Sequence, residues 1–309
     1  MFATLLRKTA APDMAGIGVN AQGIAVAKIA RKAGKKPTLL AGDFYGYSSN
    51  AAPDALLRNC AQKYRLQKTT CCLVLEEGDY KLLLTEAPKV PDAEMATALR
   101  WRIKDLVDAP VAELTLDVIH APHGAATQQA SVQVVAARND LLRQRIGLLQ
   151  GAKINLQVID IAEMAQRNIA ALLPQDKTGI AVLSLRPRYG LITLTRDGEL
   201  YLSRVLNTGL DAVTDRQLQE GSFSQIALQI QRSLDYYEGH LQQPAIRHLA
   251  LLPLPDGAEK FVEYLKGNLS VAVSLVDLND LVDHEKELPR DLQAQIFLSF
   301  GAALRERAA

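Results

Sequence analysis

The chain has 309 residues, of which 48% are hydrophobic and 22% are charged, so it is long enough for two globular domains and is neither disordered nor fibrous in composition. Its 35 lysine and arginine residues nearly balance its 34 aspartate and glutamate residues, which gives no electrostatic reason to expect nucleic acid as a partner. No run approaches about 18 apolar residues, so we expect no transmembrane helix and a cytoplasmic protein.

The first half of the chain begins with a strand–turn–strand pattern. From Met14 to Ala30, two short apolar runs flank Asn20-Ala21-Gln22-Gly23, whose residues favour a turn. The pattern that follows predicts strand 38–47, helix 53–67, strands 69–76 and 80–86, helix 92–107, strands 114–121 and 131–138, helix 140–150, strand 154–161 and helix 162–173. In helix 92–107, Asp92 is expected to be the N-cap, and the predicted buried stripe is Met95, Leu99, Ile103 and Leu106.

The second half repeats this opening from Gly179 and continues into a third strand, with turn residues at 186–190 and 196–198. Ser222 and Gln225 have the spacing of a capping box, which predicts the start of a long helix that Gly239 ends. The remaining elements are expected to be strand 248–254, helix 257–267, strand 271–277 and helix 290–305. The repeated opening predicts an internal duplication, with two related α/β domains that face each other.

Three stretches of the sequence carry a family resemblance. One consists of Arg100 and Trp101 followed by Asp108-Ala109-Pro110, Glu113 and Asp117; the others are 141–172 and the QRSLDYY segment at 231–237. They resemble the PilM/MshI family of actin-like proteins of type IV pilus assembly, and MshI of the mannose-sensitive haemagglutinin (MSHA) pilus in particular. The resemblance implies an α/β, actin-like (ASKHA) two-domain fold. Its first domain would span 14–174, with a subdomain inserted at about 92–173, and its second would span 178–309.

The resemblance also implies where a nucleotide would bind, and this chain departs from the family at each loop. An Asp-x-Gly hairpin uses its carboxylate to organise a metal shell and its glycine to let backbone amides approach phosphate. Gly18 and Asn20 occupy those places in the first hairpin, and Ser184 and Arg186 occupy them in the second. In the third loop, Pro253-Leu254-Pro255 replaces a glycine pair, and proline has no N–H. We therefore expect neither ATP hydrolysis nor a bound cofactor.

The resemblance implies a protein partner as well. The family captures the short cytoplasmic N-terminal tail of a single-pass inner-membrane protein, here a PilN-like or MshJ-like protein, in a groove between the first-domain core and the inserted subdomain. Arg100, Trp101 and Lys104 are the expected contacts, because Trp101 lies opposite the apolar stripe and tryptophan is favoured at binding hot spots. Packing of Trp101 against the adjoining subdomain is the alternative. The expected function is a non-catalytic cytoplasmic scaffold that reaches the inner membrane through its partner.

Two other functions remain open at this point. An active actin-like ATP-binding protein or kinase would need acidic residues in both hairpins. The cytoplasmic domain of the related type II secretion protein has the same fold and continues into a transmembrane helix.

The histidines and cysteines give no sign of a metal site. His120 and His123 have no third ligand nearby, whereas a closed zinc site needs four. Cys60, Cys71 and Cys72 lack framework spacing, which favours free buried thiols in a reducing compartment.

Overall fold

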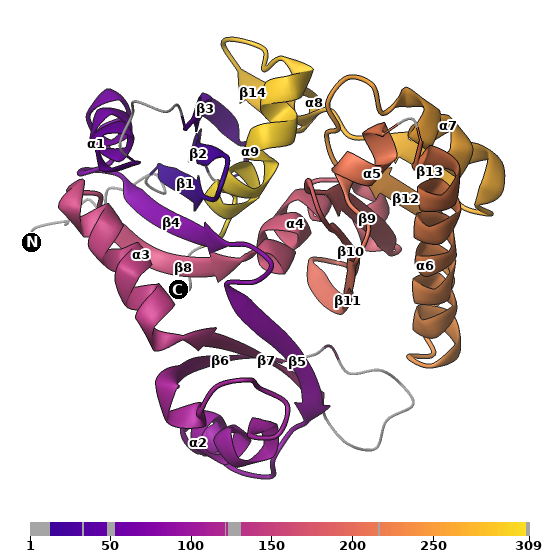
Figure 1. The fold of residues 1–309 in the computed structure, drawn as a ribbon, viewed down its shortest axis with the longest axis horizontal. Helices are drawn as coiled ribbons and strands as arrows, with labels where there is room; N and C mark the ends of the chain where they lie inside the picture. Colours follow the sequence, from indigo (N-terminus) through magenta and orange to yellow (C-terminus); the bar gives the residue numbers. More distant parts are fainter. Residues whose placement is uncertain are drawn as a thin grey trace, which may run out of the picture.

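A computed structural model describes residues 13–32, 34–47, 53–120, 122, 131–215 and 217–306. In these residues the chain forms two lobes, each built on its own sheet, and a smaller module built on a third sheet (Figure 1). The two lobes lie side by side, and the module extends from the first lobe, at the bottom of the view.

The first lobe carries a six-stranded sheet in the order β14-β3-β2-β1-β4-β8. Its elements are β1 (Met14–Val19), β2 (Gly23–Ala30), β3 (Thr38–Gly46), α1 (Pro53–Lys63), β4 (Thr70–Leu75), α3 (Asn139–Gly151), β8 (Leu156–Ile161), α4 (Ala162–Ala170), β14 (Asp283–His284) and α9 (Arg290–Ala303). β1, β2 and β3 are antiparallel neighbours, whereas β4 and β8 run parallel to β1. The predicted first hairpin is confirmed, and Asn20 N donates to Gly23 O across its turn at 3.1 Å.

The second lobe carries a five-stranded sheet in the order β11-β10-β9-β12-β13. Its elements are the 3-10 turn η2 (Pro174–Lys177), β9 (Ile180–Leu185), β10 (Gly190–Arg196), β11 (Glu199–Leu206), α5 (Leu210–Thr214), α6 (Gln219–Gly239), β12 (His248–Leu251), α7 (Glu259–Asn268), β13 (Ala272–Leu275) and α8 (Leu278–Leu281). Three antiparallel strands are again followed by two parallel ones. Apart from β14, the two sheets have the same order, which confirms the predicted repeat of the opening pattern.

The long helix of the second lobe starts earlier than predicted. α6 begins at Gln219, and the N–H of Ser222 donates to the carbonyl oxygen of Leu218 at 3.0 Å, so Ser222 lies inside the helix and is not its cap. A turn in which Leu218 N bonds to Asp215 O leads directly into the helix. The predicted apolar face of α6 is confirmed by its burial against the sheet; its members are Phe223, Ile226, Ala227, Ile230, Leu234 and Tyr237.

The small module is a three-stranded sheet covered by one helix. Its elements are β5 (Tyr80–Glu86), α2 (Asp92–Ile103), the 3-10 turn η1 (Val111–Glu113), β6 (Leu114–His120) and β7 (Ser131–Arg138), in the sheet order β5-β7-β6. The module therefore spans 80–138 instead of the predicted 92–173. β8 does not belong to the module, because it pairs in parallel with β4 and so extends the sheet of the first lobe.

The helix of the module, α2, differs from its prediction at both ends. It starts at Asp92 after Pro91 and ends at Ile103, so Asp92 is not the N-cap. Met95, Leu99 and Ile103 are buried against the module sheet as predicted. Leu106 follows the end of the helix and is 51% exposed, because helical spacing no longer turns it inward.

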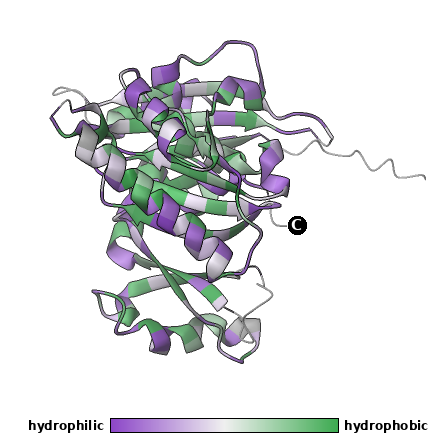
Figure 2. Ribbon diagram, turned by 90° about the vertical axis from the view of Figure 1, so that its right-hand side faces the viewer, coloured by the Kyte–Doolittle hydropathy of each residue, from purple (hydrophilic) through white to green (hydrophobic). Residues whose placement is uncertain are grey.

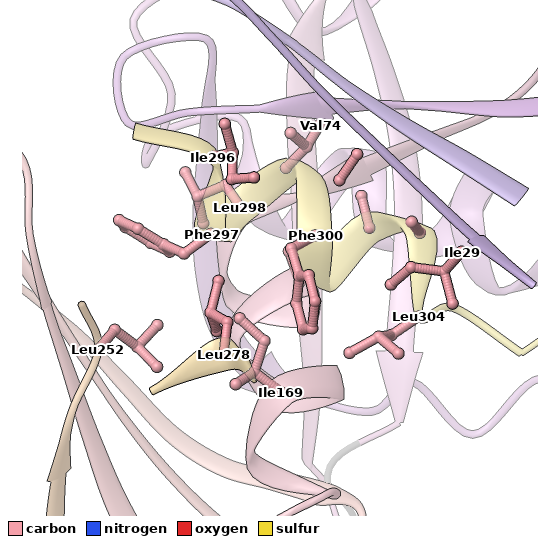
Figure 3. Close-up of a cluster of buried hydrophobic side chains, with 14 of the residues drawn as sticks. Ile29, Val74, Ile169, Leu252, Leu278, Ile296, Phe297, Leu298, Phe300 and Leu304 are labelled. Carbon is pink, nitrogen blue, oxygen red and sulfur yellow. The ribbon is translucent and has the colours of Figure 1, made fainter. Parts of the chain in front are cut away.

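The last helix, α9, packs in the first lobe, although the predicted second domain, 178–309, includes it. A Cβ on Gly16 of β1 would lie 1.9 Å from the carbonyl oxygen of Ser299, so α9 approaches the sheet closely only because that residue is glycine. In Figure 3, Phe300 points towards Ile169 of α4, and Phe297 lies on the side of Leu252 in the second lobe. A helix that is apolar on nearly every side is stable only when it is covered all round, and the space between the two sheets provides that cover.

Apolar residues concentrate along the strands and on the inner sides of the helices, while polar residues are frequent on the outer sides (Figure 2). Within the described ranges, no helix combines the length and the apolar character that crossing a membrane requires.

The three cysteines are buried and free, as the sequence predicted. Burial raises the pKa of Cys60 to about 11 and that of Cys71 to about 12. The thiolate is the reactive form of cysteine, and a raised pKa keeps these thiols protonated near neutral pH. We therefore interpret them as unreactive core side chains.

Candidate functional site

The first hairpin, the second hairpin and the end of β4 meet between the two lobes. Glu76 follows β4 directly, and its carboxylate accepts hydrogen bonds from Arg186 Nε and Nη2 at 3.0 and 2.9 Å. It also accepts one from Asn20 Nδ2 at 2.9 Å, and the Tyr189 hydroxyl lies 3.4 Å from Glu76 Oε2. We call Asn20, Glu76, Arg186 and Tyr189 the interlobe cluster.

The charges of the interlobe cluster neutralise each other in a largely dry place. The side chain of Arg186 is 7% exposed and that of Glu76 is 15% exposed. The guanidinium carbon also lies 5.6 Å from the ring centroid of Phe297 on α9. A two-pronged arginine–carboxylate contact is among the stronger charge-assisted interactions, so this pair joins the first lobe to the second.

Backbone amides of the first hairpin, and the amide of Arg186 in the second, are engaged within their own loops. Asn20 Oδ1 accepts from Gln22 N at 2.9 Å and from Gly23 N at 3.1 Å. In the second hairpin, Arg186 N donates to Tyr189 O at 2.8 Å. An Asp-x-Gly loop would offer such amides to a phosphate, whereas here the side chain of Asn20 already receives those of the first hairpin.

Two of the predicted loop residues face the core instead of the interlobe cluster. A Cβ on Gly18 would lie 3.1 Å from Ser299 Oγ and 3.7 Å from Val74 Cγ1, which leaves little room for a carboxylate. Ser184 is buried and donates to Gln166 Oε1 on α4 at 2.8 Å. Gln166 Nε2 in turn donates to Val182 O at 2.7 Å, so Ser184 helps to fasten α4 to the second sheet.

The proline loop after β12 lies outside the interlobe cluster. Pro253 is buried and Pro255 is half-buried. Arg290, at the start of α9, donates from Nε to Leu254 O at 2.9 Å, and its Nη1 lies 3.4 Å from Glu259 Oε1. The structure thus brings Asn20 and Arg186 together, but among the described residues no hydrogen bond connects the proline loop to them.

The three predicted partner contacts on α2 have different surroundings. Arg100 Nη1 donates to Val111 O at 2.7 Å and to Leu114 O at 3.3 Å, so its guanidinium holds η1 and β6 to the helix. Trp101 is 75% exposed, which rules out the alternative that it packs against an adjoining subdomain. Lys104 is exposed just beyond the helix end. Trp101 and Lys104 are therefore accessible, whereas Arg100 is a structural residue of the module.

A groove next to the interlobe cluster was not predicted. Glu77, Tyr80–Leu83, Glu163, Ser203 and Val205 line it, and we call it the β5–β11 groove; its volume is about 250 Å³. Glu163 accepts a short hydrogen bond from the Tyr80 hydroxyl, and Ser203 Oγ lies 3.4 Å from its other oxygen. Burial raises the pKa of Glu163, and the partial burial of the Glu77 carboxylate raises the pKa of that group too. No sequence signal could have found the groove, because its residues come from three elements far apart in the chain.

No group of three or more histidine, cysteine, aspartate or glutamate side chains suited to a metal occurs within the part of the chain that the structure describes. His120 ends β6, and His123 lies outside the described residues.

Paired sheets with the same strand order, facing each other across α4 and α9, define the class of protein: this chain has the two-domain actin-like fold. Over 94% of its length it is similar to a chain of the PilM-PilN type IV pilus biogenesis complex, with a TM-score of 0.74, 20% identity and 97% of that chain covered.

Two further solved structures have the same fold. The cytoplasmic domain of EpsL, an inner membrane component of the type II secretion system of Vibrio cholerae, matches with a TM-score of 0.54 and 12% identity over 96% of both chains. A Bacteroides thetaiotaomicron protein with an actin-like ATPase fold and unknown function matches with a TM-score of 0.50 and 10% identity, over 93% of this chain and 96% of that one. No protein-family model and no curated protein matches the sequence.

Proposed function

We propose that this protein is a non-catalytic scaffold of type IV pilus biogenesis, of the MshI kind, that binds the N-terminal cytoplasmic tail of a single-pass PilN-like or MshJ-like inner-membrane protein. The observation that carries the proposal is the likeness to a chain of a PilM-PilN complex over nearly the whole length. The resemblance at Arg100-Trp101 and 231–237 supports it from the sequence side. Such a protein works in the cytoplasm and reaches the inner membrane through its partner.

The second part of the proposal is that the scaffold works without ATP. The Glu76–Arg186 pair supports this because it fills the space between the hairpins with a neutralised ion pair. The engaged amides of the first hairpin and the close approach of Ser299 to Gly18 support it further. Calorimetric titration with Mg-ATP should give no binding heat up to millimolar nucleotide, and micromolar affinity would overturn this part.

Tail binding can be tested on the exposed face of α2. The probe is a synthetic peptide that copies about ten N-terminal residues of a PilN-like single-pass inner-membrane protein. A segment of that size buries less than a standard interface, so modest affinity is expected. If Trp101 is an anchor, Trp101→Ala should weaken binding by at least about tenfold. Leu40→Ala, at an apolar residue of β3 that is 49% exposed, is the control. Equal binding by wild type and Trp101→Ala removes Trp101 from the interface.

A second candidate is a scaffold of type II secretion, which the likeness to the EpsL cytoplasmic domain favours. The two systems present different membrane partners. Pull-down with detergent-solubilised pilus and secretion inner-membrane proteins distinguishes them, since selective retention of the secretion protein would reject the pilus assignment.

A further inference from the structure

The β5–β11 groove lies between two strands that both end their sheets. Among the described strands, β5 pairs with β7 alone and β11 with β10 alone. Figure 1 shows β5 running from the first lobe into the small module, below β11. The outer edge of such a strand has unpaired N–H and C=O groups, which can pair with an extended segment of another protein.

The size and lining of the groove indicate what it can hold. Its volume of about 250 Å³ is below the roughly 300–1,000 Å³ of pockets for small-molecule ligands, so it suits one long side chain. β5 contributes the unbroken run Tyr80–Leu83, whereas β11 contributes Ser203 and Val205. A lining by consecutive residues means that the strand edge itself borders the groove. A segment paired with β5 would therefore point alternate side chains into it.

Two carboxylates, those of Glu77 and Glu163, line the groove together with the lysine Lys81, and among the described residues no ion pair of Glu163 occurs. Glu163 is 2% exposed, and the hydroxyls of Tyr80 and Ser203 donate hydrogen bonds to its carboxylate. Glu77 lies on the same groove, while the nearby cation of Lys81 is paired with Asp108. An ionised carboxylate that is buried without a cation is unfavourable, and a lysine or arginine supplied by a partner would compensate it.

We propose that the β5–β11 groove binds the partner's tail as an extended strand added to the edge of β5, with a lysine or arginine side chain of the tail reaching Glu163. This inference rests on the proposed function, because it names the recognition chemistry of the same tail. Cytoplasmic segments beside a membrane helix are enriched in lysine and arginine, so the tail of a single-pass protein has the charge that the groove lacks. The apolar side chains of Leu82, Leu83 and Val205 receive the aliphatic stem of the basic residue.

The proposal makes binding depend on pH in a defined direction. The tail's cation binds the ionised form of Glu163 more tightly than the protonated form. The groups that face Glu163 are Tyr80 of β5, Ser203 of β11, Glu77 at the turn before β5, and Lys81, which is paired with Asp108. Because burial favours the protonated carboxyl, affinity should rise with pH as Glu163 ionises.

The test uses the full chain and the same tail peptide, titrated between about pH 5 and about pH 8. Glu163→Gln keeps a hydrogen-bonding side chain at this position and should weaken binding by at least about tenfold and remove its rise with pH. Val205→Lys, at a residue of β11 that is 37% exposed, should weaken it too, while Leu40→Lys, at a residue of β3 that is 49% exposed, should not. Replacing the peptide's basic residue by norleucine should make wild type and Glu163→Gln bind alike, which a merely structural role of Glu163 would not produce.

The outcomes separate the two claims. If the peptide binds and the Glu163 and Val205 variants bind it like wild type, the groove assignment is wrong while tail capture stands, with Trp101→Ala locating it on α2. If wild type binds no tail peptide at either pH, the proposed function and this inference fall together.

Discussion

Breaking the ion pair between the lobes should strongly destabilise the protein. Arg186→Met removes the guanidinium but keeps a long apolar side chain beside Phe297. The Glu76 carboxylate, 15% exposed, would lose both arginine hydrogen bonds and keep the amide of Asn20. Leaving one partner of a buried pair uncompensated costs about 3–5 kcal/mol. The remaining amide bond and the partial exposure place this case near the lower value, about 3 kcal/mol, which corresponds to a fall in Tm of about 5 °C for a chain of this length.

The assay is urea unfolding of wild type, Arg186→Met, Glu76→Gln and the double variant. The double variant should recover a large part of the loss, with a coupling energy of about 2 kcal/mol, because it leaves no buried charge. Arg138→Met is the matched control, since the Arg138–Asp140 pair is exposed on both sides and its loss should hardly move the midpoint. If Arg186→Met costs less than about 1 kcal/mol, or the two single costs simply add, the pair does not join the lobes as described.

Three further outcomes are expected. Gly18→Asp, which restores the acid of the first hairpin, should destabilise the protein by at least about 2 kcal/mol because Ser299 leaves little space, and calorimetry should still detect no Mg-ATP binding. Burial raises the pKa of Glu163, so its ionisation opposes folding; Glu163→Gln should raise Tm at about pH 7 but not at about pH 3, where the carboxyl is protonated in both states. Cys60 and Cys71 should react with a maleimide only after unfolding, and rapid labelling of the native protein would contradict their burial.

Local chemistry made much of the fold predictable. Asn20 to Gly23 form the first turn as expected, and Asn20 Oδ1 closes it by accepting from two amides of the same loop. The apolar periodicity of 223–237 identified the buried face of α6 correctly. Such features depend on residues within a few positions of each other, so one segment contains the information.

Element ends and module boundaries were less predictable. The sequence of 154–161 predicts a strand. That this strand, β8, pairs with β4 and not with the module sheet depends on residues about 80 positions away. The same limit applies to α9, whose close contact needs Gly16 at the other end of the chain. Ser222 has the residue spacing of a cap, yet an earlier turn already starts the helix.

The candidate site divides in the same way. From the sequence alone, the absence of the hairpin acids, the repeated opening and the resemblance to an actin-like family were determined, because each is a property of residue identity and order. Only the tertiary structure decided that Arg186 meets Glu76 and that Glu163 lies buried beside Ser203, with no ion pair to it among the described residues. Those contacts join residues of different lobes, and their energies come from desolvation and distance, which chain folding creates and sequence order does not specify.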